Sequence, residues 1–210
     1  MPHEISYVMK ILGFASMIFG AYFAFKEVNF IKIIILSSLS SIGYLLVLWP
    51  YNSSDIIFVI LQFMIIDSVT KFALMIMPPS VGVHDFNIKF IRSFAVNHKL
   101  AASIFAIILL NAAAIPPSFY FFNKIQIIEL LVIKDFWLII PVAVSSLLMA
   151  MVFIRIARQM IKTIDEENFY FNVDKKGLSA MAFCAIILVA SFFMTDFITH
   201  LATQIYQGIN

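Results

Sequence analysis

Apolar residues run along this chain in long stretches that only short polar connections interrupt. A helix needs about 20 mainly apolar residues to cross the hydrocarbon core of a bilayer, and six stretches reach that length. We therefore predict membrane spans at Ile5–Phe25, Phe30–Trp49, Ile56–Met77, Leu100–Val132, Phe136–Ala157 and Leu178–Ile205. The polar connections between them are too short for a separate domain, so we expect residues 1–210 to form one all-α integral membrane domain.

The composition excludes an ordinary soluble domain. Apolar residues make up 62% of the chain and the four charged residue types 12%, against about 25% charged residues in typical globular proteins. A net charge of +2 is too small for the basic face that binds nucleic acid. The single cysteine, Cys184, excludes an internal disulfide and a thiolate metal cage. The start of the chain lacks a charged n-region and a cleavage site, so we expect neither a signal peptide nor a transit peptide.

Lysine and arginine mark the orientation, because the cytoplasmic or matrix side of a membrane protein collects them. One set of alternate connections carries Lys26, Lys89, Arg92, Lys99, Arg158, Lys162, Lys175 and Lys176. The opposite set carries Lys10 and Lys134. We predict that the first set faces the cytoplasm or matrix and that both termini face the intermembrane space or periplasm.

The fourth predicted span is abnormal. Leu100–Val132 would be about 50 Å long as a straight α-helix, whereas the hydrocarbon core is about 30 Å thick. Pro116 and Pro117 in its middle remove two backbone donors, which predicts a break there. Broken helices at membrane depth persist only where the freed carbonyls face protein or a water-filled cavity, and in transporters they mark the ion path.

Three lysines fall at membrane depth, where a charge costs roughly 2.5–3.5 kcal/mol. Lys32 lies one turn inside its span, and its stem can reach the interface. Lys71 has Asp67 four residues before it on the same helical face. That spacing fits either a neutralised structural pair or a proton-relay site.

Lys124 follows the predicted break by about two turns, close to Asn123, Gln126 and Glu129. We interpret these residues as part of a hydrated polar axis; the alternative is a buried lysine that pairs structurally with Glu129. The chain contains neither an HExxH motif nor a GxSxG elbow, and with six glycines it has no phosphate cradle. We therefore expect no catalytic constellation, no metal and no cofactor in this chain.

Two segments resemble a known family. Ile11–Tyr44 contains a small-residue helix that leads through a lysine into an SS-x-x-x-x-GY helix, and Asn97–Leu131 contains the double proline followed by Phe122-x-Lys124. Both resemble the antiporter-like, proton-translocating membrane subunits of respiratory complex I. With LWPYN at residues 48–52, the resemblance is closest to the branch of subunit 2, which is subunit N in bacteria. Ala114 and Tyr120 stand where that family usually has glycines around the prolines.

The resemblance implies a membrane-arm subunit of a proton-translocating NADH:ubiquinone oxidoreductase that contributes a proton half-channel and carries no NAD, flavin or iron–sulfur cluster. Lys124 would match the lysine of the broken helix and Lys71 the central lysine, with Asp67 and Glu129 as counter-charges. The chain resembles only the second of two inverted repeats and the closing helices. We therefore expect other membrane-arm subunits as partners, including a separate chain with the first repeat; the alternative is a shortened, degenerate subunit.

Two other functions fit the same residues: a subunit of a multisubunit cation/proton antiporter, and a scaffold subunit that conducts nothing. The Ile, Phe and Lys bias favours the mitochondrial inner membrane, with the bacterial plasma membrane as the alternative.

Overall fold

A computed structural model describes residues 3–51, 53–80, 86–161 and 174–193. Within these ranges the chain forms eight α-helices and two short 3-10 helices. They are α1 (His3–Lys26), α2 (Phe30–Leu48), η1 (Trp49–Tyr51), α3 (Ser54–Ser80), α4 (Phe90–Asn97), α5 (Lys99–Ala112), α6 (Phe119–Lys134), η2 (Phe136–Leu138), α7 (Ile139–Ile161) and α8 (Lys175–Phe193).

The predicted all-α membrane fold is confirmed. Five helices, α1, α2, α3, α7 and α8, are long and apolar enough to cross a bilayer, and α5 is a shorter apolar helix. Within the described ranges, the only β-type backbone pairing is an isolated bridge between Asn29 and Asn87. Of the last predicted span, the structure describes residues 178–193 as helix, and residues 194–205 lie outside the described ranges.

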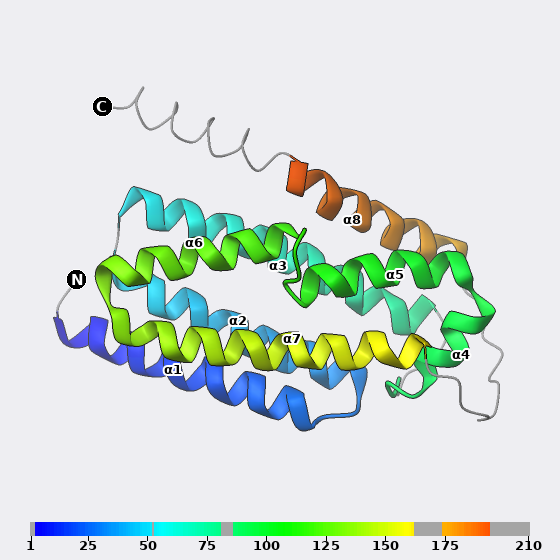
Figure 1. Ribbon diagram of the computed structural model, residues 1–210, viewed down its shortest axis with the longest axis horizontal. Coiled ribbons are helices and arrows are strands. Elements are labelled where there is room, and N and C mark those ends of the chain that lie inside the picture. The colour runs from blue at the N-terminus through cyan, green and yellow to red at the C-terminus, as the bar shows by residue number, and fades with distance from the viewer. Residues whose placement is uncertain (1–2, 52, 81–85, 162–173, 194–210) are drawn as a thin grey trace.

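The predicted break at Pro116–Pro117 is also confirmed. Helix α5 ends at Ala112 and α6 begins at Phe119, so the long apolar stretch becomes two helices placed end to end (Figure 1). Ala114 takes a left-handed conformation with a φ of 52°. The side chain of Ser118 caps α6 by accepting a hydrogen bond of 3.2 Å from the Phe121 N–H.

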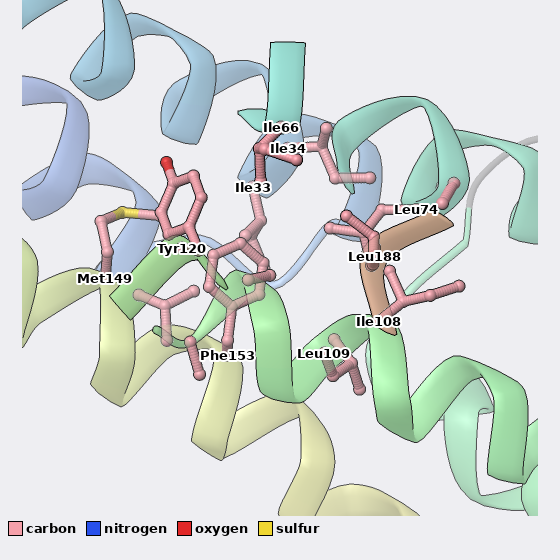
Figure 2. Close-up of a cluster of buried hydrophobic side chains, with 14 of the residues drawn as sticks. Ile33, Ile34, Ile66, Leu74, Ile108, Leu109, Tyr120, Met149, Phe153 and Leu188 are labelled. Atoms are coloured by element: carbon pink, nitrogen blue, oxygen red, sulfur yellow. The ribbon is translucent and has the colours of Figure 1, made fainter. Parts of the chain in front are cut away.

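The helices pack around this broken pair in a bundle. Helix α7 returns alongside α5 and α6, with α1 and α2 on one side, and α8 lies along α3 and α5 on the other (Figure 1). The core around the break is apolar and includes Ile108, Leu109, Met149 and Phe153 (Figure 2). Burial of these side chains fixes the ends of α5 and α6 against α7.

Helices α1 and α2 cross closely because small residues meet at their contact. A Cβ added at Gly20 would lie 2.6 Å from the Ser40 backbone nitrogen and 2.8 Å from the Leu36 carbonyl oxygen. Serine hydroxyls cross the contact in both directions: Ser16 donates to the Leu39 carbonyl at 2.6 Å, and Ser40 donates to the Met17 carbonyl at 3.2 Å. These contacts hold α2, and the site residues on it, at a fixed distance from α1.

Two features differ from the predicted element boundaries. Helix α4 lies within the connection Pro78–Lys99, which we expected to be polar loop. It is a short amphipathic helix whose Ile91 and Phe94 are buried. Helix α3 continues through Pro78 and Pro79 to Ser80, although neither proline has an N–H to donate within the helix.

Candidate functional site

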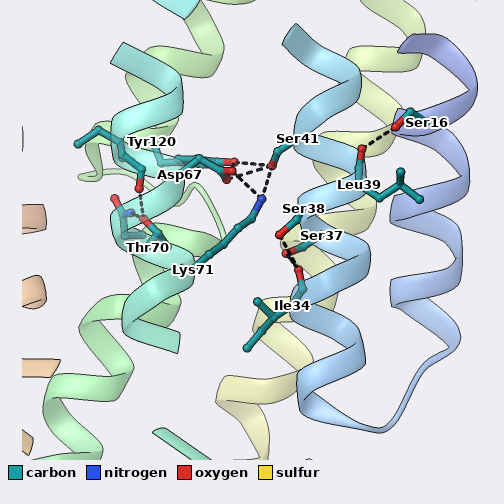
Figure 3. A network of polar contacts seen from close by, with 12 residues as sticks. Ser16, Ile34, Ser37, Ser38, Leu39, Ser41, Asp67, Thr70, Lys71 and Tyr120 are labelled. Carbon is teal, nitrogen blue, oxygen red and sulfur yellow. Dashed lines mark hydrogen bonds and ion pairs between the residues drawn. The ribbon is translucent and has the colours of Figure 1, made fainter. Parts of the chain in front are cut away.

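A partly buried ion pair lies in the middle of α3. Lys71 Nζ is 2.6 Å from Asp67 Oδ2, one helical turn away. Ser41 of α2 joins both groups: its hydroxyl accepts from Lys71 at 2.7 Å and donates to Asp67 Oδ1 at 3.0 Å (Figure 3). The Lys71 and Asp67 side chains are 14% and 16% exposed, so each charge depends on the other and on Ser41 for compensation.

Tyr120 connects this pair to the helix break. It lies in the first turn of α6, and its hydroxyl donates to Asp67 Oδ1 at 2.8 Å and lies 3.4 Å from the Ser41 hydroxyl (Figure 3). Its ring packs against Phe63 with 5.3 Å between centroids. In the sequence, only the position of Tyr120 just after the double proline indicated a role at the break. The fold is needed to show that its hydroxyl reaches α3.

Lys124 lies one turn further along α6 and is 6% exposed. Its Nζ donates to the Ser146 hydroxyl of α7 at 3.0 Å and lies over the rings of Tyr120 and Tyr44, at 5.0 and 5.6 Å from the centroids. The Tyr44 hydroxyl is in turn 2.8 Å from that of Ser145. Within the described part of the chain, no carboxylate lies within 4.0 Å of this amine, so hydroxyls and aromatic rings surround the lysine.

The structure places Glu129 away from the other predicted site residues. It is exposed on α6, and its predicted pairing with Lys124 is absent from the described ion pairs. With Asn123 and Gln126 it forms a polar stripe, in which the three side chains recur every third residue and become more exposed toward the end of α6.

Several polar atoms of α6 and of α3, which packs against it, are buried without a hydrogen-bond partner in the described chain. They are both amide atoms of Asn123, both amide atoms of Gln62 on the adjacent α3, and Oε1 of Gln126. A buried polar group without a partner costs free energy, and water is the usual solution. We therefore expect water molecules to hydrogen-bond these amide atoms.

A cavity of about 20 Å³, measured as the volume open to the centre of a water-sized sphere, lies between the two lysines. A cavity of more than about 10–15 Å³ by this measure can hold a water molecule. Its walls carry two amines, one carboxylate and several hydroxyls, which are groups that accept and donate protons or hydrogen-bond water. The lining comprises Ser37, Ser40, Ser41, Tyr44, Asp67, Thr70, Lys71, Leu74, Ala112, Tyr120, Lys124, Met149 and Phe153.

Other charged residues lie outside this cluster. Lys32 is exposed in the first turn of α2. Arg155 of α7, which we overlooked as an intramembrane charge, donates to the carbonyls of Phe25 and Glu27 at 2.7 Å each and so caps the end of α1. Across the described ranges, no three His, Cys, Asp or Glu side chains are grouped as metal ligands would be.

A second ion pair joins α1 to the α6–α7 connection. Lys10 Nζ lies 2.5 Å from Asp135 Oδ2, and the Tyr51 hydroxyl donates to the same oxygen. The Lys10 ammonium, followed by the Tyr51 hydroxyl, lowers the pKa of the Asp135 carboxyl below its usual value. This pair lies far along α6 from Lys124, so it is separate from the central cluster.

Comparison with known proteins gives one consistent family. Residues 1–149 match the sequence profile of the family described as "NADH:quinone oxidoreductase/Mrp antiporter, TM". NADH-quinone oxidoreductase subunit N of Rickettsia prowazekii is 26% identical over 163 residues, which are 75% of this chain and 36% of that protein. Subunit N of Neorickettsia risticii is 26% identical over 189 residues, covering 86% of this chain and 40% of that protein.

The fold has a solved counterpart. A chain of respiratory complex I from Thermus thermophilus, solved with bound Aureothin, superposes with a TM-score of 0.71 at 14% sequence identity. The match covers 90% of this chain and 44% of that chain. The chain therefore spans less than half the length of these relatives and of the structural counterpart.

Proposed function

Because the chain belongs to the NADH:quinone oxidoreductase/Mrp antiporter transmembrane family, we propose that it is a subunit N-like component of a proton-translocating NADH:quinone oxidoreductase. In this role it contributes a proton half-channel that electron transfer elsewhere in the complex drives. The observation that carries the proposal is a single one: a partly buried Asp67–Lys71 pair adjoins a broken membrane helix that carries Lys124.

The chemistry of the cluster suits proton exchange. The Lys71 amine contacts Asp67 and Ser41. If a change in the local electric field removes its proton, these two groups can stabilise the amine in either its charged or its neutral form. Lys124 lacks such a carboxylate and is surrounded by neutral hydroxyls and rings. A proton that leaves Lys71 would therefore reach Lys124 through the cavity they share.

From Lys124 the proton would continue along the polar stripe of α6. Asn123 and Gln126 would hold water with their unpaired amide atoms, and Glu129 would be the exposed group at the end of the route. This assigns Glu129 to the outer part of the path, and Asp67 alone to the compensation of charge near the lysines. The basic-loop count places that end of α6 on the periplasmic or intermembrane-space side, with both termini.

In this role the chain has partner subunits and a membrane location, and it carries no redox group. The partners would be the other membrane-arm subunits and the helices of the first repeat. The relatives reported above are bacterial, which favours the bacterial plasma membrane, whereas the residue bias favours the mitochondrial inner membrane. Quinone and NADH chemistry would take place in other subunits.

One other function follows from the family, which also includes the Mrp antiporters. A cation/proton antiporter subunit would use the same lysines but would purify without NADH-oxidising subunits. Affinity purification of the tagged chain from its native membrane separates the two: co-purified NADH oxidation supports the complex I assignment, and exchange of Na⁺ for protons without that activity supports the antiporter.

The proton role is tested by Lys124→Ala in the assembled complex. We expect assembly and NADH oxidation to persist in detergent, while proton uptake by reconstituted vesicles per NADH oxidised falls. Lys175→Ala, which removes an exposed lysine at the start of α8, is the matched control and should pump normally. If the Lys124 variant translocates protons at the normal ratio, the subunit is a scaffold.

A further inference from the structure

A groove opens at the junction of α1 and α2, on the opposite end of the bundle from Asp135. It has a volume of about 420 Å³, measured as above, and is lined by Phe23, Lys26, Glu27, Lys32, Ile35 and Leu36. The last turn of α1, the short connection after it and the first turns of α2 supply these residues. The groove therefore lies where two membrane helices end, at the level of the lipid headgroups.

The groove carries a net positive charge. Lys26 and Lys32 are exposed, and neither belongs to an ion pair among the described residues. Glu27 is the opposing charge, but its Oε1 accepts hydrogen bonds from the backbone N–H groups of Val28 and Asn29 at 2.9 and 3.0 Å. These bonds lower the pKa of the Glu27 carboxyl, with the Lys32 ammonium adding to the effect, and they hold the carboxylate on the loop.

An apolar track continues from the lysines toward the membrane centre. On α1, the rings of Phe19 and Phe23 stack with 6.2 Å between centroids, and both are half-exposed. On α2, Ile35, Leu39 and Ile42 are exposed at a spacing that places them on one helical face. A ligand that satisfies both parts needs an anionic end and a long apolar end.

We propose that this groove binds a phospholipid with a net negative headgroup. The phosphate lies between Lys26 and Lys32, and the acyl chains lie along the track formed by the Phe19–Phe23 stack and Ile35. Basic pockets between membrane helices are a recurring site for anionic headgroups. A free phosphate ion would satisfy the two lysines but would leave the apolar track unused, so the occupant is the lipid.

The test uses the full chain purified in a neutral detergent, with lipid binding followed by native mass spectrometry. Phosphatidylglycerol should bind more tightly than phosphatidylcholine. Lys26→Gln and Lys32→Gln should each weaken phosphatidylglycerol binding about fivefold, from a contribution of about 1 kcal/mol per lysine. Glu27→Gln removes the opposing charge while its amide oxygen can still accept the loop hydrogen bonds, so it should strengthen that binding.

Lys175→Gln, which removes an exposed lysine at the start of α8, is the control and should leave phosphatidylglycerol binding unchanged. Equal melting temperatures of the lipid-free proteins establish that each variant is folded. Equal binding of the two lipids, or a loss in the control as large as in the groove variants, would overturn the site. Competition by inorganic phosphate at the same concentration would identify a free-anion site instead.

Discussion

Lys124 is buried and Lys71 is partly buried, and the surroundings of the two amines differ. Lys71 contacts a carboxylate at 2.6 Å, whereas Lys124 contacts a serine hydroxyl at 3.0 Å and two aromatic rings. Tyr120 lies between them, with its hydroxyl on Asp67 and its ring under the Lys124 amine. It therefore contacts both the ion pair and the second lysine.

Replacing Tyr120 with Phe should keep the ring and remove the hydrogen bond to Asp67. We expect the free energy of unfolding to fall by about 1–2 kcal/mol, because the lost bond is to a charged group. Proton uptake by the reconstituted complex should also fall several-fold, because Asp67 loses a bond that orients it. Tyr22→Phe, on the exposed side of α1, should change neither quantity. Unchanged pumping by the Tyr120 variant would assign Tyr120 a purely structural role.

Ala114 is strained by its left-handed backbone, with a φ of 52°. An L-residue in this conformation costs roughly 1–2 kcal/mol relative to glycine. Ala114→Gly should therefore raise the free energy of unfolding by about 0.5–1 kcal/mol, and with it the melting temperature. Ala113→Gly is the matched control: its φ of −72° is ordinary for alanine, so glycine there should destabilise. If both variants lower the melting temperature, the turn does not have this conformation in the membrane.

At the scale of elements, the α1–α2 contact depends on the absence of side chains. The Gly20 position faces backbone atoms of Ser40 and Leu36, which cannot rotate away as a flexible side chain could. The serine hydrogen bonds across the same contact fix its register. A change in this spacing would move Ser41 and Tyr44 relative to α3 and α6.

Gly20→Ala tests this contact. In an exposed helix the change would stabilise by about 1 kcal/mol, but here the added methyl group must separate the helices. We expect a net loss of about 1–3 kcal/mol in the free energy of unfolding, as for other overpacked sites. Phe19→Ala, at the exposed neighbouring position, is the comparison and should cost much less. Thermal melting in detergent measures both, and a stabilised Gly20 variant would show that the helices are not in contact.

At the scale of the whole molecule, two ties join elements that are distant in the sequence. Lys10, Tyr51 and Asp135 tie α1 and the α2–α3 connection to the α6–α7 connection. At the other end, Arg155 ties α7 to the end of α1. Each tie satisfies charges or carbonyls where the helices leave the membrane, and together they close the bundle at both ends.

The tie at Asp135 predicts a pH dependence of stability. The native state lowers the pKa of Asp135 below its usual value of 3.8, so the tie contributes fully above that value and is lost as the pH falls through the lower native pKa. Asp135→Asn should therefore melt below the wild type at pH 7, and the difference between the two melting temperatures should shrink as the pH falls below 3.8. A difference that stays constant over this range would mean that the Asp135 charge does not stabilise the fold.

The sequence predicts the fold better than it predicts the site. Apolar stretches of membrane length and the pair Pro116-Pro117 are local features, and both correspond to helices and to a break. Asp67 and Lys71 were found together because one helix carries both. The contacts of Lys124 were not predictable, because Tyr44, Ser145 and Ser146 come from other helices and meet it only after packing. Helix α4 was missed because it is short and only two of its apolar side chains, Ile91 and Phe94, are buried.

The hydrogen bonds from Arg155 to the end of α1 couple the position of α7 to that of the hairpin between α1 and α2. Ser146, which holds the Lys124 amine, and Arg155 lie nine residues apart on the rigid rod of α7, a separation of about 14 Å. A tilt of α7 that accompanies protonation at Lys124 would pull on the hairpin between α1 and α2, where Glu27 is anchored. Protonation at Lys124 would then move the connection between α1 and α2, and a lipid bound in the groove there would resist that movement.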